Sequence, residues 1–337
     1  MKTIHELLTP ALCVDARVLE KNLAVMATAL PGPRLRPHVK AHKCTELAKR
    51  QAAHGHRTFT CATVPEAVAL AASGLGEDIL LANEIVDRYK LYRLAELVRL
   101  QPSTRITLAV DSRETVEAAA RAGLRDVLID VNVGLPRCGV APHKAGKLAD
   151  YARRANLNVR GVMGYEGHVV GMENRIVRSV GCSISMALLR YAHGAVGGDI
   201  VSAGGTGTYG CNAVATEIQA GSYALMDGTY AKLGLPFGQA LTVLATVISI
   251  SAGYVTVDAG VKCFGMDHGK PAGTSGLKVA YCADEHIVLF GRKLPRVGDR
   301  VALRPAHVDP TVACHERLHV IDGEQVLESW PVDMRGW

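Results

Sequence analysis

The stretch Leu35-Arg36-Pro37-His38-Val39-Lys40 has the pattern of a short strand that follows a proline-rich turn at Pro31–Pro33. Apolar and β-branched residues favour a strand, and the turn sets its beginning. The residues from Thr45 to Ala52 have the pattern of a helix. We therefore predict that Lys40 lies where a strand ends and a helix is about to begin.

Lys40 has two imidazoles and a second lysine close to it in the sequence, at His38, His42 and Lys43. Neighbouring positive charge and burial both disfavour an ammonium ion, and they lower a lysine pKa from about 10.4 towards neutrality. A neutral amine is what Schiff-base chemistry with an aldehyde cofactor requires. The alternative is a basic turn on a solvated surface.

The same alternation of strand and helix recurs about eight times between Leu12 and Asp227, which is typical of a (β/α)8 TIM barrel. Doubly wound sheets rarely contain so many units. The expected strands are Leu12–Val14, Leu35–Lys40, Thr58–Ala62, Ile79–Ala82, Ile106–Val110, Val127–Val131, Val159–Tyr165 and Ile200–Ala203. The clearest helices are Val18–Leu30, Pro65–Ala72, Arg113–Ala122 and Lys144–Ala155.

The pattern changes after Leu241, where short β-rich segments are separated by Gly, Pro and Asp turns without helical periodicity. These segments are Val243–Ser249, Tyr254–Val257, Val279–Tyr281, Ile287–Leu289, Arg300–Arg304, Arg317–Ile321 and Gln325–Val326. They predict a C-terminal all-β domain. We expect residues 12–235 to form the α/β barrel, and residues 1–11 and 236–337 to form the β domain.

Composition and charge indicate a globular protein of 337 residues with a net charge of +6 and no Lys/Arg block. We therefore expect no nucleic-acid partner and a mild attraction for anionic ligands. No apolar run reaches the length of a signal peptide or a membrane span, so we expect no membrane association. The nine cysteines have no CxxC spacing, and their odd number favours a reducing compartment. These features predict a cytoplasmic protein.

Chemistry in a TIM barrel collects at the C-terminal ends of the strands, and two further stretches fall there. Arg137 lies in a Gly-Pro loop after a strand, where it can donate a forked hydrogen bond to an anionic oxygen or pair with a surface acid. Tyr165 and His168 leave another strand end in Gly164-Tyr165-Glu166-Gly167-His168. A tyrosine can lie against a flat ring and a histidine can act as acid or base, or both can be structural.

A glycine-rich segment follows the last expected barrel strand, in Gly204-Gly205-Thr206-Gly207-Thr208-Tyr209. Glycines let backbone N–H groups approach a phosphate, and late loops of TIM barrels often hold one. Gly221 and Ser222 come shortly after and can complete the same site. In the β domain, His307 and Asp309 share one face if the chain there is extended. One imidazole and one carboxylate suit Mn²⁺, Mg²⁺ or Zn²⁺, whereas a surface ion pair is the alternative.

Taken together, these residues resemble the D-threonine aldolase and D-serine dehydratase family. The resemblance runs from end to end of the chain. The motifs that carry it are Arg36-Pro37-His38-Val39-Lys40-Ala41-His42-Lys43-Cys44, Ile79-Leu80-Leu81-Ala82-Asn83-Glu84, Arg137-Cys138-Gly139-Val140, Gly204-Gly205-Thr206-Gly207-Thr208-Tyr209, Gln219-Ala220-Gly221-Ser222-Tyr223, Val257-Asp258-Ala259-Gly260-Val261-Lys262 and Pro305-Ala306-His307-Val308-Asp309-Pro310-Thr311-Val312. The family implies an alanine racemase-like (fold type III) barrel that binds pyridoxal 5'-phosphate, with a C-terminal β domain.

The resemblance also implies roles for residues of the barrel. Lys40 resembles the lysine that forms the Schiff base with the cofactor, and Arg137 resembles the arginine near its phenolic oxygen. Tyr165 resembles the tyrosine beside the cofactor ring. His168 and a metal-bound hydroxide are the two candidates for the base that deprotonates the substrate hydroxyl.

The remaining roles concern the phosphate and the metal. Gly204–Thr206, Gly221 and Ser222 match the phosphate-binding loops of the family, and His307 and Asp309 match its metal ligands. The aldolase branch resembles this chain in having His-x-Asp there, whereas the dehydratase branch more often has His-x-Cys. The resemblance therefore favours the aldolase, with Mn²⁺ as the expected metal and Mg²⁺ or Zn²⁺ as alternatives.

The activity implied by the resemblance is retro-aldol cleavage of D-β-hydroxy-α-amino acids such as D-threonine to glycine and an aldehyde. Lys40 would exchange its imine for the substrate amine, and the metal would hold the β-hydroxyl group. The alternatives are β-elimination from D-serine or 3-hydroxy-D-aspartate, racemisation of an amino acid, and a non-catalytic carrier of pyridoxal phosphate. The family also implies a homodimer.

Overall fold

The structure, a computed structural model, describes residues 2–336, which divide into two units that are described separately. The β unit comprises the residues up to Val25, together with Ala41–Glu46 and Ser222–Asp333. The barrel unit comprises Met26–Lys40, Leu47–Gly221 and the residues from Met334. Within residues 2–336, no helix has both the length and the apolar character needed to cross a bilayer.

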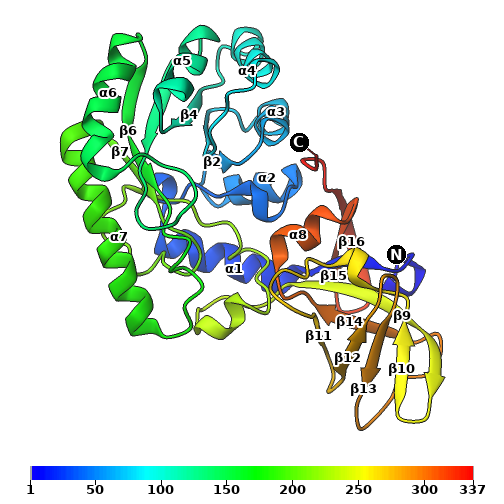
Figure 1. Cartoon of the computed structure of the whole chain (residues 1–337). Coiled ribbons are helices and arrows are strands. Elements are labelled where there is room, and N and C mark those ends of the chain that lie inside the picture. Colours follow the sequence, from blue (N-terminus) through cyan, green and yellow to red (C-terminus); the bar gives the residue numbers. More distant parts are fainter. Residues whose placement is uncertain (1, 337) are drawn as a thin grey trace. The chain divides into compact units, whose positions relative to one another are not determined.

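The barrel unit is built on a parallel sheet whose seven strands follow one another in chain order. The strands are β2 (Thr58–Cys61), β3 (Asp78–Leu81), β4 (Ile106–Val110), β5 (Asp126–Asp130), β6 (Asn158–Gly164), β7 (Ile200–Ala203) and β8 (Glu217–Ile218). Figure 1 shows the sheet curled, with helices along its outer side. Side chains such as Leu80, Ala109, Leu128 and Met163 pack together in a buried cluster of this unit. The expected α/β barrel is thus confirmed.

The segment 35–38 occupies the position of the eighth strand, between β8 and β2. Leu35 forms a parallel bridge with Ile218, and His38 forms one with Thr60. The expected regular strand from Leu35 to Lys40 is wrong, because short 3-10 turns over Gly32–Arg34 and Val39–Ala41 flank these two bridges. Pro37 has no N–H group to donate, which interrupts a regular strand ladder at this point.

The helices alternate with the strands as the sequence predicts, and the four named above begin and end within two residues of their expected bounds. Along the chain they are α1 (Ala16–Ala29), α2 (Thr45–Ala53), α3 (Val64–Ala72), α4 (Arg88–Leu100), α5 (Arg113–Arg121), α6 (Ala145–Arg154) and α7 (Arg175–Val196). The start of α3 is fixed by a capping box, in which Thr63 Oγ1 accepts from the Glu66 N–H group.

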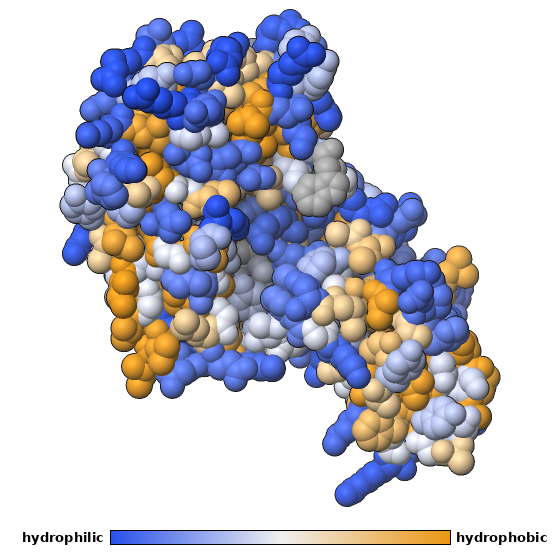
Figure 2. Space-filling model, viewed as in Figure 1, coloured by the Kyte–Doolittle hydropathy of each residue, from blue (hydrophilic) through white to orange (hydrophobic). Residues whose placement is uncertain are grey.

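Helix α7 has an apolar stripe on its exposed side as well as a buried side. Ile176, Val180, Ile184 and Tyr191 all have more than half of their surface exposed. Figure 2 shows apolar residues in a line along the edge of the barrel unit where α7 runs. Exposed apolar patches of this kind often mark protein contacts.

The β unit contains a nine-stranded mixed sheet with the main order β12-β13-β10-β9-β1-β15-β16, and β14 pairs with β9 and β11. The strands are β1 (Ala11–Asp15), β9 (Leu241–Ser251), β10 (Tyr254–Val257), β11 (Ala272–Gly273), β12 (Lys278–Cys282), β13 (Ile287–Phe290), β14 (Arg300–Arg304), β15 (Arg317–Asp322) and β16 (Gln325–Pro331). The expected β-rich segments after Leu241 are all strands of this sheet.

Strand β1 corrects one expectation, because the sequence pattern places Leu12–Val14 among the barrel strands. In the structure β1 pairs in parallel with β15 and antiparallel with β9. Four of its five residues are buried, so the strand has no polar face that could distinguish a barrel from a mixed sheet. Its pairing depends on partners that are more than 200 residues away.

A buried network of ion pairs ties the segment 35–38 to the barrel. Arg36 Nε donates to Glu217 Oε1 at 2.8 Å, and Arg36 Nη1 lies 3.4 Å from Asp78 Oδ1. Arg160 Nη2 donates to Asp78 Oδ2 at 2.6 Å. Burial alone would raise the pKa of Asp78, but the hydrogen bond from Arg160 and the charges of Arg36 and Arg160 lower it below its ordinary value. The four side chains come from β3, β6, β8 and the closing segment.

Replacing Arg36 by Met should destabilise the protein strongly. The Arg36 side chain is only 2% exposed, and its loss leaves Glu217 buried beside an uncharged partner. We expect the free energy of unfolding in urea to fall by about 3–5 kcal/mol. The matched control is Arg57→Met, since Arg57 is 78% exposed and pairs with Glu77 at 3.8 Å, and it should cost less than about 1 kcal/mol. Equal effects of the two substitutions would contradict a structural role for the buried network.

Candidate active site

Lys40 lies in the 3-10 turn Val39–Ala41, directly after the segment that closes the barrel. His38 forms a bridge with Thr60 of β2, so the following turn emerges at the C-terminal end of the strands. The Lys40 side chain is half-buried, and its backbone N–H group donates to His38 Nδ1 at 3.5 Å. The amine of Lys40 therefore comes from the end of the barrel where TIM-barrel enzymes carry their reactive groups.

Arg137 and Tyr165 come from two neighbouring strand ends and lie together. The guanidinium carbon of Arg137 is 5.5 Å from the centroid of the Tyr165 ring, which is within the range of a cation–π contact. Tyr165 directly follows β6, and Arg137 lies in the loop after β5. The exposed guanidinium can donate to an anion while the tyrosine ring offers a flat apolar surface.

His168 is exposed and packs against the same loop as Arg137. A Cβ atom on Gly134 would lie 2.9 Å from both Cε1 and Nε2 of His168, and Gly134 has a φ of +124°. Only glycine combines this backbone conformation with such a close approach. The loop after β5 thus brings the imidazole of His168 and the guanidinium of Arg137 to one end of the barrel.

The glycine-rich loop after β7 is held in shape by a buried carboxylate, Glu166. Glu166 accepts hydrogen bonds from the Gly204 N–H group at 3.2 Å and from Thr208 Oγ1 at 2.8 Å. The Gly205 N–H group donates to Thr208 Oγ1 at 3.1 Å. The amides of Gly204 and Gly205 are thus used inside the protein, so these two residues shape the loop. Thr206, the third predicted phosphate ligand in this loop, is buried.

Gly205 also brings this loop against the tyrosine. A Cβ atom there would be 3.4 Å from Tyr165 Cε2 and 3.8 Å from Tyr165 Oη. The missing side chain therefore lets the backbone of the loop approach the ring of Tyr165 closely.

Acidic residues surround the backbone of the Arg137 loop. Asp130 ends β5 and is buried, and burial raises its pKa well above the ordinary carboxyl value. The charge of Glu84 and a hydrogen bond to it raise the pKa further, while the charge of Arg137 lowers it. Asp111 Oδ2 accepts from the Gly139 N–H group at 3.2 Å. Burial and the charge of Glu84 thus make Asp130 harder to ionise in the folded protein.

The predicted metal ligands His307 and Asp309 belong to the β unit. His307 precedes helix α8 (Val308–Ala313) and has extended backbone angles, while Asp309 lies in the first turn of that helix. The expected extended strand through both residues is therefore wrong, and so is the expected absence of helix in this part of the chain. Pro310 explains the difference, because proline is accepted in the first turn of a helix but interrupts a strand ladder.

The surroundings of Asp309 are also polar. Asp309 Oδ1 accepts from Ser222 Oγ at 3.4 Å, so the predicted phosphate ligand Ser222 interacts with a predicted metal ligand. Gly221 is buried and ends the barrel unit. Asp227 Oδ2 accepts from the Val308 N–H group at 2.9 Å and thereby holds the first turn of α8. Burial raises the pKa of Asp227 despite its backbone hydrogen bonds.

His307 has two neighbours that the sequence did not suggest. Gly265 forms an antiparallel bridge with His307, and the chain then continues to Asp267 and His268. Asp267 Oδ2 lies 2.7 Å from His307 Nδ1, and the rings of His268 and His307 are stacked at 3.9 Å. One ligand atom from each of these three side chains lies within 4.8 Å of the others, so the group can hold a metal ion.

The sequence therefore missed four residues with clear structural roles in these sites, namely Glu166, Asp227, Asp267 and His268. Glu166 lies in a strand-end stretch that the sequence singles out, between Tyr165 and His168, and a buried position there would have indicated it. Asp267 and His268 form an Asp-His pair in a turn, between residues Gly265 and Gly269. That pair is a weak signal without knowledge of the bridge to His307.

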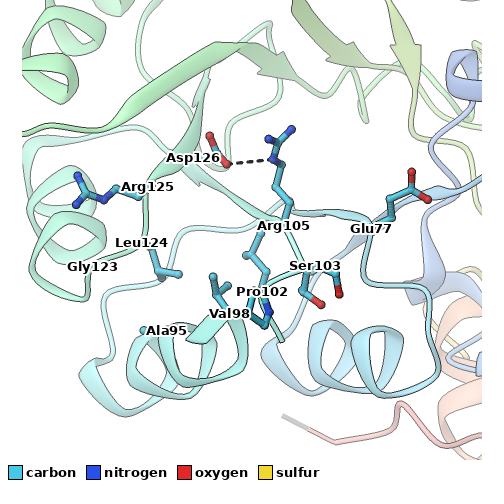
Figure 3. A pocket seen from close by; sticks show the side chains of 12 residues that line it. Glu77, Ala95, Val98, Pro102, Ser103, Arg105, Gly123, Leu124, Arg125 and Asp126 are labelled. Carbon is cyan, nitrogen blue, oxygen red and sulfur yellow. Dashed lines mark ion pairs between the residues drawn. The ribbon is translucent and has the colours of Figure 1, made fainter. Parts of the chain in front are cut away.

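A cavity of about 370 Å³ lies elsewhere in the barrel unit, where β4 and β5 begin. Figure 3 shows its lining, in which Arg105 and Asp126 form an ion pair at 3.4 Å. This is the N-terminal end of the strands, whereas active sites of TIM barrels lie at the C-terminal end. The cavity is therefore separate from the candidate site around Lys40.

Comparisons with known proteins agree with the two-part organisation. Residues 14–225 match the model of "Alanine racemase, N-terminal domain", and residues 240–321 match that of "Putative serine dehydratase domain". A D-threonine aldolase from Arthrobacter sp. is 37% identical over 98% of this chain and 93% of its own. A 3-hydroxy-D-aspartate aldolase from Paracoccus denitrificans is 30% identical over the same shares of the two chains.

A solved structure is similar over its whole length. The crystal structure of D-threonine aldolase from Filomicrobium marinum superposes with a TM-score of 0.94 and 31% identity, and it covers 99% of this chain and 98% of the other.

Replacing Asp130 by Asn should remove part of the pH dependence of stability. The pKa of the Asp130 carboxyl group is raised in the folded state. As the pH rises above the ordinary carboxyl pKa of about 3.9, this group therefore ionises first in the unfolded chain. The wild type then loses stability with rising pH until the raised pKa is passed. The Asn side chain does not titrate, so the variant should gain stability relative to the wild type across this window. Urea unfolding at a series of pH values measures the difference. A pH-independent difference would show that Asp130 ionises normally in the folded protein.

Proposed function

Because this chain belongs to the D-threonine aldolase and D-serine dehydratase family of alanine racemase-like enzymes, we propose that it cleaves D-β-hydroxy-α-amino acids to glycine and an aldehyde. It is an enzyme of the lyase class, and the similarity to named aldolases over nearly its whole length supports this reaction. The choice of aldolase over dehydratase depends on Asp309, the carboxylate two residues after His307. In the dehydratase branch of the family this position is more often a cysteine.

The residues of the barrel unit fit pyridoxal 5'-phosphate. The half-buried ring of Tyr165 offers an apolar surface to a flat ring, and we assign its phosphate to the end of the barrel where the glycine-rich loop lies. Arg137 offers a guanidinium group to an anionic oxygen, and Lys40 offers an amine at the same end of the barrel. The bound cofactor supplies a conjugated system that accepts the electron pair of the breaking Cα–Cβ bond.

The chain's own groups then have separate tasks. Lys40 would hold the cofactor, and Lys40 or a water molecule would return a proton to Cα of the glycine product. His168 is exposed, and its imidazole takes the proton of the β-hydroxyl group. Arg137 fixes the orientation of the ring by a charge-assisted hydrogen bond.

The residues of the β unit fit a divalent metal ion. His307 and Asp309 would hold it, with nitrogen and oxygen donors that suit Mn²⁺, and Mg²⁺ or Zn²⁺ are the other ions we consider. Such an ion supplies Lewis acidity, which lowers the pKa of a coordinated hydroxyl group. We further propose a cytoplasmic homodimer, as the family resemblance implies.

The purified protein should be yellow, and borohydride should attach the cofactor covalently to Lys40. The attachment requires the amine that forms the Schiff base, so mass spectrometry of a digest should find the adduct on the peptide with Lys40. Lys43→Arg is the control, because it keeps Lys40 and should be labelled like the wild type, whereas Lys40→Arg should not be labelled. An adduct on Lys43 would overturn the assignment of Lys40.

The products should identify the bond that breaks. We expect D-threonine and D-phenylserine to give an aldehyde and glycine in equal amounts, with keto acid as a minor product. A chelator should abolish turnover without removing the yellow colour, because we assign the metal to the β-hydroxyl and not to the cofactor. The assay measures aldehyde and keto acid on D- and L-substrates with each metal. Dominant keto acid would place the chain with the dehydratases, and a preference for L-substrates would refute the proposed stereochemistry.

A further inference from the structure

The loop that contains Asp267 is held against His307 by the backbone. The Gly265 N–H group donates to Thr311 Oγ1 at 3.0 Å, and Thr311 Oγ1 donates to the carbonyl oxygen of His307 at 2.7 Å. A Cβ atom on Gly265 would lie 2.1 Å from Pro310 Cγ, so only glycine allows this approach. The position of Asp267 beside the imidazole therefore follows from the fold of the β unit.

The distance of 2.7 Å between Asp267 Oδ2 and His307 Nδ1 is that of a short hydrogen bond. A neutral imidazole carries one proton, so a donor at Nδ1 leaves the lone pair of Nε2 for a metal ion. The stacked ring of His268, tilted by only 7° from that of His307, restricts rotation of the imidazole. His268 is itself held by Thr229, whose Oγ1 lies 3.3 Å from His268 Nδ1.

We propose that Asp267 is a positioning residue, which accepts a hydrogen bond from His307 Nδ1 and so makes Nε2 the metal-binding atom. This inference rests on the proposed function, in which His307 binds a divalent metal. Carboxylates that accept from metal-bound histidines raise the basicity of the imidazole and fix its orientation. Asp267 therefore strengthens metal binding without touching the metal.

The alternative is a metal ion bound directly by Asp267, His268 and His307. Two donor atoms about 2.1 Å from one octahedral ion stand roughly 3 Å apart, which is longer than the observed 2.7 Å between Asp267 Oδ2 and His307 Nδ1. The observed distance therefore fits a hydrogen bond at Nδ1 better than a metal ion that Asp267 shares with this nitrogen. The direct arrangement makes different predictions for the variants below.

The test is a titration of the metal-free protein with Mn²⁺, in which the electron paramagnetic resonance signal of the free ion reports binding. We expect Asp267→Ala to weaken Mn²⁺ binding by about 10- to 100-fold, as is usual for the loss of such a partner. The Mn²⁺ affinity of Asp267→Asn should lie between those of Asp267→Ala and the wild type. Its amide oxygen still accepts a hydrogen bond from His307 Nδ1 but has no charge. His307→Ala should bind no Mn²⁺ at this site.

Two controls separate positioning from other effects. Asp284→Asn removes an exposed carboxylate of the same unit and should bind Mn²⁺ like the wild type. His268→Phe keeps a stacked ring without a metal-binding nitrogen, and its Mn²⁺ affinity should also stay within about threefold of the wild-type value. Thermal unfolding of the metal-free variants should match the wild type, since Asp267 is largely exposed.

The outcomes are distinct. Unchanged Mn²⁺ affinity in Asp267→Ala overturns the inference and leaves the proposed function intact. A loss in Asp267→Asn as complete as in His307→Ala, or a complete loss in His268→Phe, overturns it in favour of direct ligation. A wild type that binds no Mn²⁺ refutes Mn²⁺ as the metal of the proposed function and overturns the inference with it.

Discussion

The barrel depends on the buried guanidinium of Arg36. Backbone hydrogen bonds join the segment 35–38 to both neighbouring strands, from the N–H groups of Arg36 and His38 to the carbonyl oxygens of Ile218 and Ala220, and from the Thr60 N–H group to Pro37. The segment is nevertheless short, because Pro37 cannot donate and 3-10 turns lie on both sides. The pair of Arg36 with Glu217 at 2.8 Å adds a buried side-chain attachment to the two bridges. Burying such charges is costly, and they are stable only as a complete set. The network therefore selects one arrangement of the closing segment over others.

This constraint explains how Lys40 acquires a fixed position at the other end of the same segment. Arg36 is anchored near the beginning of β3 and β8, through Asp78 and Glu217, which are the first residues of these strands. Four residues of chain then carry the backbone along the barrel to Lys40. Here the ion pairs fix the beginning, the bridge at His38 fixes the end, and the turn at Val39–Ala41 sets the direction of the lysine.

The sequence predicted most of the fold because strand and helix patterns are local. Ile106–Val110 and Ile200–Ala203 were predicted with their observed bounds, since apolar runs between turns define buried parallel strands. Strand β1 could not be placed in the same way. Its pairing with β9 is decided by contacts across more than 200 residues, and a fully apolar strand gives no indication of its sheet. The helical turn at Asp309 was missed because three residues of pattern cannot distinguish a strand from a first helical turn.

The site was predicted unevenly for a related reason. A sequence search finds groups that could touch a ligand, such as Lys40, Arg137 and His307. It does not find carboxylates that act inside the protein, because their partners are backbone amides or distant side chains. Glu166 holds the loop at Gly204, Asp227 holds the first turn of α8, and Asp267 lies against the imidazole of His307. A carboxylate that accepts such bonds fixes the direction of its neighbour, because the bonds are short and directional. The precision of the reactive groups therefore comes from acids that need not meet a ligand themselves.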